Sequence, residues 1–295
     1  MKLAYRIVNV FGRPGEPFTG NPLCVFEDGS GLDGATMHAL ALQFNLSETT
    51  FILPSDIATA RVRIFTPAME LPFAGHPTLG TAQVVRALRG AGDAITLQMQ
   101  AGVIPVVARG KHWTLQANAP TTRRLEPSRL AALAAALGLG VDAFAAPPLW
   151  VNTGMEQLLV PLASRDAVRA ASPGAGLAAF GNAAGKVSVY CFSPLDEAPV
   201  DPATADPVLN REPMLVRFFF AKNTGSVSED PATGSACANL GGYVVATGQR
   251  LPLERTLLQG DAVGRPSVLG LGVDGSGTIR VSGEVIELGH GILEL

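Results

Sequence analysis

The feature that most constrains the fold of this chain is a pattern that occurs in both halves. Arg63-Ile-Phe65 and Arg217-Phe-Phe219 each resemble a strand that precedes a helix start at the same distance. Placing the first segment on the second without a gap also aligns five further pairs: Pro77 with Pro231, Gly80 with Gly234, Ala82 with Ala236, Thr81 with Ser235, and His76 with Asp230. The pattern predicts two pseudo-equivalent halves whose helix starts point at a shared cleft, and the small number of identities leaves a chance match open.

Strands outnumber helices among the predicted elements. Strands are predicted at 3–11, 23–26, 48–53, 61–66, 94–99, 103–108, 112–116, 157–161, 186–192 and 215–220, with more near the C-terminus. Helices are predicted from a cap at Asp33 to Leu42 or Phe44, at 78–88 with Gly90 at the end, at 128–137 and at 234–247, and 117–127 is expected to be a linker. Because most strand-to-strand links are short, antiparallel or mixed sheets are expected rather than a Rossmann-like sheet.

The composition limits the classes of function open to the chain. Its 295 residues are 47% hydrophobic and 16% charged, so a large core is expected and global disorder is excluded. The net charge of −3 gives no electrostatic footprint for nucleic acid or an anionic membrane. The longest uncharged apolar stretch, 130–141, is shorter than the roughly 18 residues of a membrane span, and Arg6 interrupts the apolar run of a signal peptide. We expect a cytoplasmic protein without nucleic-acid or membrane partners.

No metal or cofactor site is indicated by the spacing of potential ligands. Cys24, Cys191 and Cys237 lie far apart, and neither a CxxC pair nor an HExxH or HxH histidine pattern occurs. A metal site assembled in three dimensions stays open. Residues 270–275 match GxGxxG literally, but they run into a turn and a strand rather than a helix. A glycine-rich hairpin is therefore expected there in place of a dinucleotide site.

Three segments have the residue types of a site for an anionic ligand or for proton transfer. Residues 73–80 (FAGHPTLG) and 229–236 (EDPATGSA) place glycine, proline and hydroxyl residues at helix starts, where free N–H groups attract anions. Glu48, in 45–51 (NLSETTF), is a candidate general base if burial in a cleft raises its pKa. Each segment has a plainer interpretation: His76 as part of a tight turn, Asp230 as a helix N-cap, and Glu48 as a solvated carboxylate.

With these segments taken together, the chain resembles the PhzF-like isomerase family of phenazine biosynthesis, which shares its fold with diaminopimelate epimerase. The matching stretches occur in the family's order over nearly the whole chain: TGNPLCVF (19–26), NLSETTF (45–51), FAGHPTLGTA (73–82), EDPATGSA (229–236) and QGDAVGRPS (259–267). The resemblance implies an α+β fold of two pseudo-equivalent domains, each a mixed, mostly antiparallel sheet rolled around a central helix. The first domain would cover 1–118, completed by the C-terminal strand at about 280–295, and the second 119–279.

The same resemblance implies roles for particular residues in an active site between the domains. Glu48 matches the family's acid/base, and His76 and Asp230 match residues that assist it as catalytic groups. Five further residues are expected to bind the substrate: Asn21, Ser47, Gly75, Gly234 and Ser235. The family implies a homodimer and neither cofactor nor metal.

The residues favour isomerisation over epimerisation. The cysteine pair of the related epimerases is absent, since neither GHPT nor DPATG contains a thiol and Cys237 lies beyond the second motif. A single carboxylate can remove a proton and return it elsewhere on the same face, which is typically worth about 10²–10⁴ in rate, while helix-start amides stabilise the enolate-like charge. We therefore predict a cofactor-independent isomerase of a small carboxylate-bearing carbon acid. A racemase or epimerase of an amino-acid-like compound, with Asp230 as the second base, and a non-catalytic small-molecule-binding protein stay open.

Overall fold

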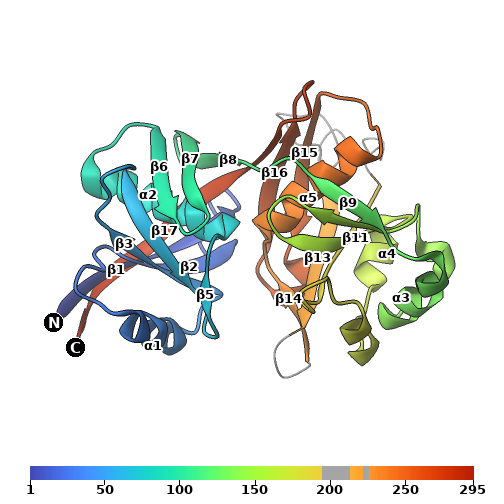
Figure 1. Ribbon diagram of the computed structural model, residues 1–295, viewed down its shortest axis with the longest axis horizontal. Coiled ribbons are helices and arrows are strands. Elements are labelled where there is room, and N and C mark those ends of the chain that lie inside the picture. Colours follow the sequence, from blue (N-terminus) through green and yellow to red (C-terminus); the bar gives the residue numbers. More distant parts are fainter. Residues whose placement is uncertain (195–212, 222–225) are drawn as a thin grey trace. The chain divides into compact units, whose positions relative to one another are not determined.

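The computed structural model describes residues 1–194, 213–221 and 226–295, and these divide into two compact units. The first unit combines Met1–Gln116 with Ser282–Leu295, and the second covers Ala117–Val281 (Figure 1). The described residues include no helix long and apolar enough to cross a membrane. Strands outnumber helices in both units, which confirms the sheet-rich character predicted from the sequence.

The first unit is a sheet that closes on itself. Its strands are β1 (Lys2–Gly12), β2 (Asn21–Phe26), β3 (Glu48–Leu53), β4 (Ala60–Phe65), β5 (Glu70–Leu71), β6 (Ala94–Met99), β7 (Gly102–Arg109), β8 (His112–Gln116) and the later part of β17 (Ile279–Glu294). β1 pairs antiparallel with β17 and β2, β2 is parallel to β3, and β3 is antiparallel to β4. β4 forms a hairpin with β5 and is parallel to β6, and β6, β7 and β8 follow antiparallel. A pairing of β8 with β17 completes the circle.

Helix α2 (Gly75–Arg89) is the centre of this unit. It packs against β1, β2, β3, β4, β6 and β8, and its first two turns are almost entirely buried (Figure 1). Gly80 permits the close approach, because a Cβ there would lie 2.6 Å from Leu23 Cδ2 and 2.9 Å from Val10 Cγ2. The helix ends at a left-handed Gly90, as predicted, but it begins before the predicted position 78. Pro77 lies within the first turn, where a helix needs no backbone N–H partner.

Helix α1 (Gly34–Phe44) covers the outer face of the same sheet. Its N-cap is Asp33, which accepts a hydrogen bond from the Thr36 N–H at 2.8 Å, so the predicted cap is confirmed. The alternation of β3 separates its two faces: Phe51 belongs to the apolar cluster under α1, while the Thr50 hydroxyl contacts that of Thr81 in α2 at 2.8 Å. Glu48 has the same parity as Thr50 and therefore shares the face that looks toward α2.

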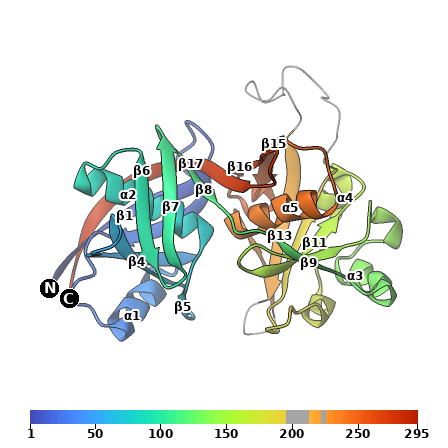
Figure 2. The same cartoon turned by 45° about the horizontal axis from the view of Figure 1, so that its top comes forward.

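The second unit repeats this order of strands. Its elements are β9 (Thr121–Arg124), η1 (Pro127–Arg129), α3 (Leu130–Ala136), η2 (Val141–Ala143), β10 (Leu149–Asn152), β11 (Glu156–Pro161), α4 (Arg165–Ala170), η3 (Ala175–Ala179), β12 (Ser188–Phe192), β13 (Met214–Ala221), β14 (Val227–Asp230), α5 (Gly234–Ala246), β15 (Leu253–Gln259), η4 (Asp261–Val263) and β16 (Ser267–Val273). β10 is antiparallel to β11, β11 is parallel to β12, and β12 is antiparallel to β13. β13 is antiparallel to β14 and parallel to β15, and β15 is antiparallel to β16. The same order of pairings runs from β1 to β7 in the first unit. Helix α5 lies against β9, β10, β11 and β16 (Figure 2).

Both units place an arginine in the same setting on the matching strand. Arg63 of β4 forms a two-point ion pair with Glu70 of β5, with both contacts at 2.7 Å, and lies over the Phe65 ring. Arg217 of β13 forms the same pair with Glu229 of β14, at 3.0 and 2.7 Å, and lies over the Phe219 ring. The match of the two RxF segments in the sequence therefore corresponds to equivalent strands.

The ungapped alignment of the two halves is wrong beyond those strands. The shift that places Arg63 on Arg217 would start the second helix near Glu229, but 227–230 form β14 and α5 begins only at Gly234. As a result, Pro77 and Gly80 lie inside α2, whereas Pro231 precedes α5. A longer connection in the second unit separates the strand from the helix, so the predicted equivalence of His76 with Asp230 fails.

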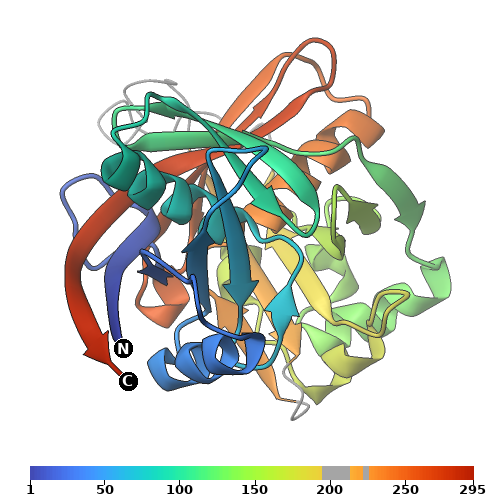
Figure 3. The ribbon, with the colours of Figure 1, turned by 60° about the vertical axis from the view of Figure 1, so that its left-hand side comes forward.

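Several short elements differ from the sequence prediction. The expected linker 117–127 contains strand β9, which pairs with β10, and the expected helix 128–137 is divided into η1 and α3. The prediction of a glycine-rich hairpin is confirmed, since 270–273 belong to β16 and a turn at 274–278 leads into β17. Figure 3 shows β1 and β17 side by side at the chain ends, where the Leu295 N–H donates to the Met1 carbonyl at 2.9 Å.

Candidate active site

Glu48 and His76 lie together in the first unit. Glu48 opens β3, His76 is the second residue of α2, and Glu48 Oε2 is 3.2 Å from His76 Nε2. Both side chains are largely withdrawn from solvent, with 15% of Glu48 and 7% of His76 exposed. The plain interpretations of a solvated carboxylate and a turn histidine do not describe this arrangement. The structure brings two of the three predicted catalytic residues into contact.

The backbone of Pro22 fixes the state of the His76 ring. Burial lowers the pKa of His76 to about 3, and a hydrogen bond to the backbone of Pro22 opposes the shift. A proline offers only a carbonyl, so the ring donates to it, and since Nε2 faces Glu48 the donor is Nδ1. In the neutral ring Nε2 then carries a lone pair directed at Glu48 Oε2. One proton placed between these two atoms would satisfy both.

The predicted substrate-binding residues of the first unit lie at the starts of the same elements that carry Pro22, Glu48 and His76. Asn21 opens β2 directly before Pro22 and is completely buried. Ser47 precedes β3, and Gly75 opens α2 after an N-cap, Ala74, that makes no side-chain capping bond. The three motifs TGNPLCVF, NLSETTF and FAGHPTLGTA therefore meet at the start of α2.

Asp230 lies in the second unit, at the end of β14. The Thr233 hydroxyl donates to Asp230 Oδ2 at 2.5 Å, and Gln259 Nε2 donates to the Asp230 carbonyl at 2.8 Å and to the Thr233 hydroxyl at 3.0 Å. The N-cap of α5 is Thr233, so the interpretation of Asp230 as the cap is wrong. The next residue, Gly260, has a left-handed φ of +87°, and a Cβ there would lie 2.2 Å from the Arg265 carbonyl oxygen. This position therefore requires glycine.

Gly234 and Ser235 form the start of α5, where Thr233 makes no side-chain capping bond. Ser235 is partly exposed, and its Oγ accepts a hydrogen bond from Gln157 Nε2 at 3.0 Å. Gln157 is in turn held by Asn239, whose Nδ2 donates to Gln157 Oε1 at 2.8 Å. On the side of Ser235, the second helix start is therefore held by neutral donors and acceptors.

No metal site emerges in the described part of the chain, which holds no group of three or more His, Cys, Asp and Glu side chains suited to an ion. The three cysteines are free and buried. Burial raises the pKa of Cys237, which lies inside α5 rather than at its start, so its thiol stays protonated at neutral pH. Cys237 is therefore not available as the second base of a thiol-based epimerase.

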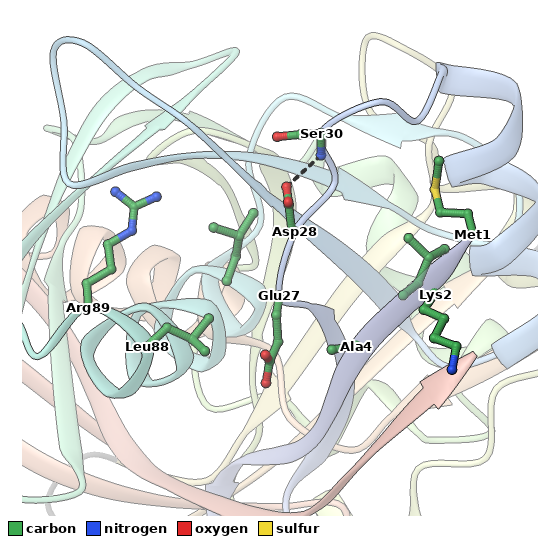
Figure 4. Close-up of a pocket in the computed structure, with 10 residues that line it drawn as sticks. Met1, Lys2, Ala4, Glu27, Asp28, Ser30, Leu88 and Arg89 are labelled. Carbon is green, nitrogen blue, oxygen red and sulfur yellow. Dashed lines mark hydrogen bonds between the residues drawn. The ribbon is translucent and has the colours of Figure 1, made fainter. Parts of the chain in front are cut away.

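A cavity of about 500 Å³ opens elsewhere on the first unit, beside the chain ends (Figure 4). Its charged side chains are already engaged: Lys2 with Glu294, Glu27 with Arg6, Asp28 with the Ser30 backbone, and Arg89 with the Thr59 carbonyl. Its lining includes none of the predicted site residues.

Comparison with known proteins identifies the family of the chain. Residues 8–291 match the family described as phenazine biosynthesis-like protein (PhzC-PhzF). An uncharacterised isomerase of Pasteurella multocida is 37% identical over 98% of this chain and 93% of its own length. The trans-2,3-dihydro-3-hydroxyanthranilate isomerase of Pseudomonas aeruginosa is 34% identical over 95% of each chain. The chain belongs to the PhzC-PhzF family.

The fold agrees with the same assignment. The crystal structure of a Bacillus anthracis phenazine biosynthesis protein of the PhzF family superposes with a TM-score of 0.82, at 22% identity, over 100% of both chains. This likeness shows that the chain has the fold of a PhzF-family protein.

Sequence reasoning missed the residues that hold the site together. Gln157 and Asn239 belong to no matched motif, and Thr233 and Gln259 were seen only as members of longer stretches. Each is a neutral residue that makes at least one hydrogen bond to a partner far along the chain. The QGDAVGRPS stretch was the one signal, because its first residue turns out to hold Asp230.

Proposed function

We propose that this protein is a cofactor-independent isomerase that moves a proton within a small carboxylate-bearing substrate. Glu48 removes the proton from a carbon next to an electron-withdrawing group and returns it to another carbon on the same face. The observation that carries this proposal is the contact of Glu48 Oε2 with the unprotonated Nε2 of a buried, neutral His76. A general base needs such a partly desolvated setting to work near neutral pH.

His76 assists in two ways in this mechanism. Its Nδ1 bond to Pro22 fixes the orientation of the ring, and its Nε2 can accept a proton from Glu48. Because burial opposes a charge on His76, the proton it accepts is easily given back, so the ring relays protons rather than storing them. Asn21, Ser47 and Gly75 contribute to binding from the same unit.

The second unit supplies binding groups and charge stabilisation. We propose that Gly234 and Ser235 contact the substrate carboxylate at the start of α5, where the helix dipole and free amides favour an anion. Asp230, oriented by the Thr233 hydroxyl, binds a polar group of the substrate. In this proposal the two helix starts face one substrate in a cleft, and the protein acts as a cytoplasmic homodimer.

The first compound to assay is trans-2,3-dihydro-3-hydroxyanthranilate, the substrate in the name of the Pseudomonas aeruginosa relative. In D₂O, an isomerase moves the double bond and places at a new carbon either the proton that Glu48 returns or a deuteron exchanged from solvent, and proton NMR detects the moved double bond in both cases. A racemase instead exchanges the proton at a stereocentre and leaves the bonds in place, so a panel of L-amino acids is incubated in parallel. Exchange confined to an α-carbon would replace the isomerase proposal with the racemase alternative.

The role of Glu48 is tested in the same assay with Glu48→Gln. This substitution keeps the size of the side chain and removes its ability to take up a proton. Retained turnover would remove Glu48 from the mechanism. Binding of these acids by the wild type without any chemistry would favour the non-catalytic binding protein.

A further inference from the structure

A chain of hydrogen bonds in the second unit fixes which way two buried amide side chains point. The Thr153 backbone N–H donates to Asn239 Oδ1 at 2.8 Å, and a backbone N–H can only donate. Asn239 Nδ2 is therefore the donating side, and it donates to the Met155 carbonyl and to Gln157 Oε1, both at 2.8 Å. With Oε1 committed as an acceptor, Gln157 turns its Nε2 toward Ser235. Both amides are completely buried, so water does not compete for these bonds.

The last bond of this chain determines the direction of the Ser235 hydroxyl hydrogen. Gln157 Nε2 donates to Ser235 Oγ at 3.0 Å, and an amide NH₂ group accepts nothing in return. The hydroxyl hydrogen therefore points away from Gln157, and no side chain or carbonyl in the described ranges accepts it. Ser235 is partly exposed, whereas Gln157 is not, so this hydrogen is available to an acceptor from outside the chain.

We propose that Gln157 is a positioning residue that makes Ser235 a dedicated hydrogen-bond donor to the carboxylate of the substrate. This inference rests on the proposed function, in which Ser235 contacts that carboxylate. Asn239 anchors Gln157, and Gln157 itself touches no substrate. The N–H groups at the start of α5 add positive potential in the same turn, which favours an anionic acceptor for the hydroxyl. The contribution of Gln157 is therefore to substrate binding and not to the proton transfer at Glu48.

Two substitutions remove the bond to Ser235 in different ways. Gln157→Glu retains an oxygen for Asn239 but presents a second acceptor, so the Ser235 hydroxyl turns inward. Gln157→Met keeps the length of the side chain and removes both polar groups. Each should raise the KM for trans-2,3-dihydro-3-hydroxyanthranilate by about 10-fold, the loss expected for a hydrogen bond to a charged group, with kcat changed less than about 3-fold. Gln83→Met is the matched control, because Gln83 is an α2 amide that accepts from Trp113 at 2.8 Å, and it should leave KM unchanged.

A double-mutant cycle separates positioning from a general structural effect. The dissociation constant for anthranilate, a stable aromatic carboxylate, is measured by calorimetry and does not depend on turnover. In the Ser235→Ala background, the uncharged Gln157→Met substitution should cause no further loss of affinity, because its effect passes through the missing hydroxyl.

The outcomes distinguish this inference from the proposed function. Three outcomes would overturn the role of Gln157. The affinity losses of the two single variants could multiply in the double variant, both folded Gln157 variants could keep wild-type affinity, or the wild type could fail to bind anthranilate. Absence of turnover with coupled anthranilate binding would instead reject the isomerase and leave the positioning role in place. Circular dichroism establishes that each variant is folded.

Discussion

The two helix starts occupy the same place in the order of strands, yet they differ in chemistry. The ladders define the correspondence: Phe51 pairs with Arg63 in the first unit, and Cys191 pairs with Arg217 in the second. Three residues before each of these, β3 begins with Glu48 and β12 begins with Ser188. A carboxylate in one unit is therefore replaced by a small hydroxyl in the other.

The residues on the helices differ in the same sense. The second residue of α2 is His76, whose Nε2 faces Glu48, and the second residue of α5 is Ser235, which accepts a hydrogen bond from a neutral amide. The first helix start places a carboxylate against an imidazole, whereas the second places a hydroxyl and a neutral amide near the Asp230 carboxylate. In the proposed mechanism, one strand order would carry a proton-transfer pair in the first unit and a binding site in the second.

The largest effect on kcat is expected at Glu48, the residue that distinguishes the first helix start from the second. Glu48→Gln should lower kcat by roughly 10³-fold, within the usual range for general acid/base catalysis. Ser188→Ala, at the corresponding position of the second unit, should change kcat less than about 3-fold. Steady-state kinetics measure both, and a comparable loss in Ser188→Ala would break the comparison.

The buried network of the second unit should have the next largest effect, on stability. Asn239→Ala removes the partners of Thr153, Met155 and Gln157 and should cost about 3 kcal/mol of unfolding free energy. In the first unit, Thr50→Val removes a single buried hydroxyl pair with Thr81 and should cost about 1 kcal/mol. Urea denaturation of the two variants measures the difference, and equal losses would contradict the unequal networks.

His76 should contribute a distinct component to the pH dependence of stability. Burial lowers the pKa of His76 from 6.5 to about 3, so between these values the unfolded chain binds more protons than the folded one. Stability should therefore fall as the pH decreases through this window, by about 2 kcal/mol between pH 7 and pH 5.

His76→Asn should lack this component of the slope, and Ser235→Ala, at the second helix start, should retain it. Chemical denaturation at the two pH values tests the prediction. The same slope in wild type and His76→Asn would show that His76 is already protonated or exposed.

The smallest effect, on stability, is expected for the arginine–glutamate ion pair that both units contain. Arg63→Lys loses the two-point contact with Glu70 and should cost about 1 kcal/mol. Arg217→Lys should cost somewhat more, because Arg217 also donates to the Ala171 carbonyl at 2.6 Å. Thermal melts of both variants sharpen the comparison, and a larger loss in Arg63→Lys would contradict it.

Much of the fold could be predicted from the sequence, because its signals are local. The Asp33 cap, the left-handed Gly90 and the bounds of β3 were all correct, since capping, glycine freedom and alternation act within a few residues. The short strands β5, β9, β10 and β14 were missed. Such strands carry little periodicity of their own and are stabilised by partners distant in the sequence.

The candidate site could be predicted in part. The contact of Glu48 with His76 joins two residues that the family resemblance had selected, while the roles of the site residues stay predictions. The hydrogen bonds of Pro22, Gln157 and Gln259 could not be foreseen, because a backbone carbonyl and two neutral amides can bond to many different partners. Residue type alone does not encode such bonds.

The account depends most on the state of the His76 ring, which ¹⁵N NMR of histidine-labelled protein observes directly. Between pH 5 and pH 8, we predict a neutral ring with the proton on Nδ1 and a free lone pair on Nε2, and the Nε2 signal should shift in Glu48→Gln. An imidazolium at pH 7, or a neutral ring with its proton on Nε2, would contradict the proposed proton-transfer pair.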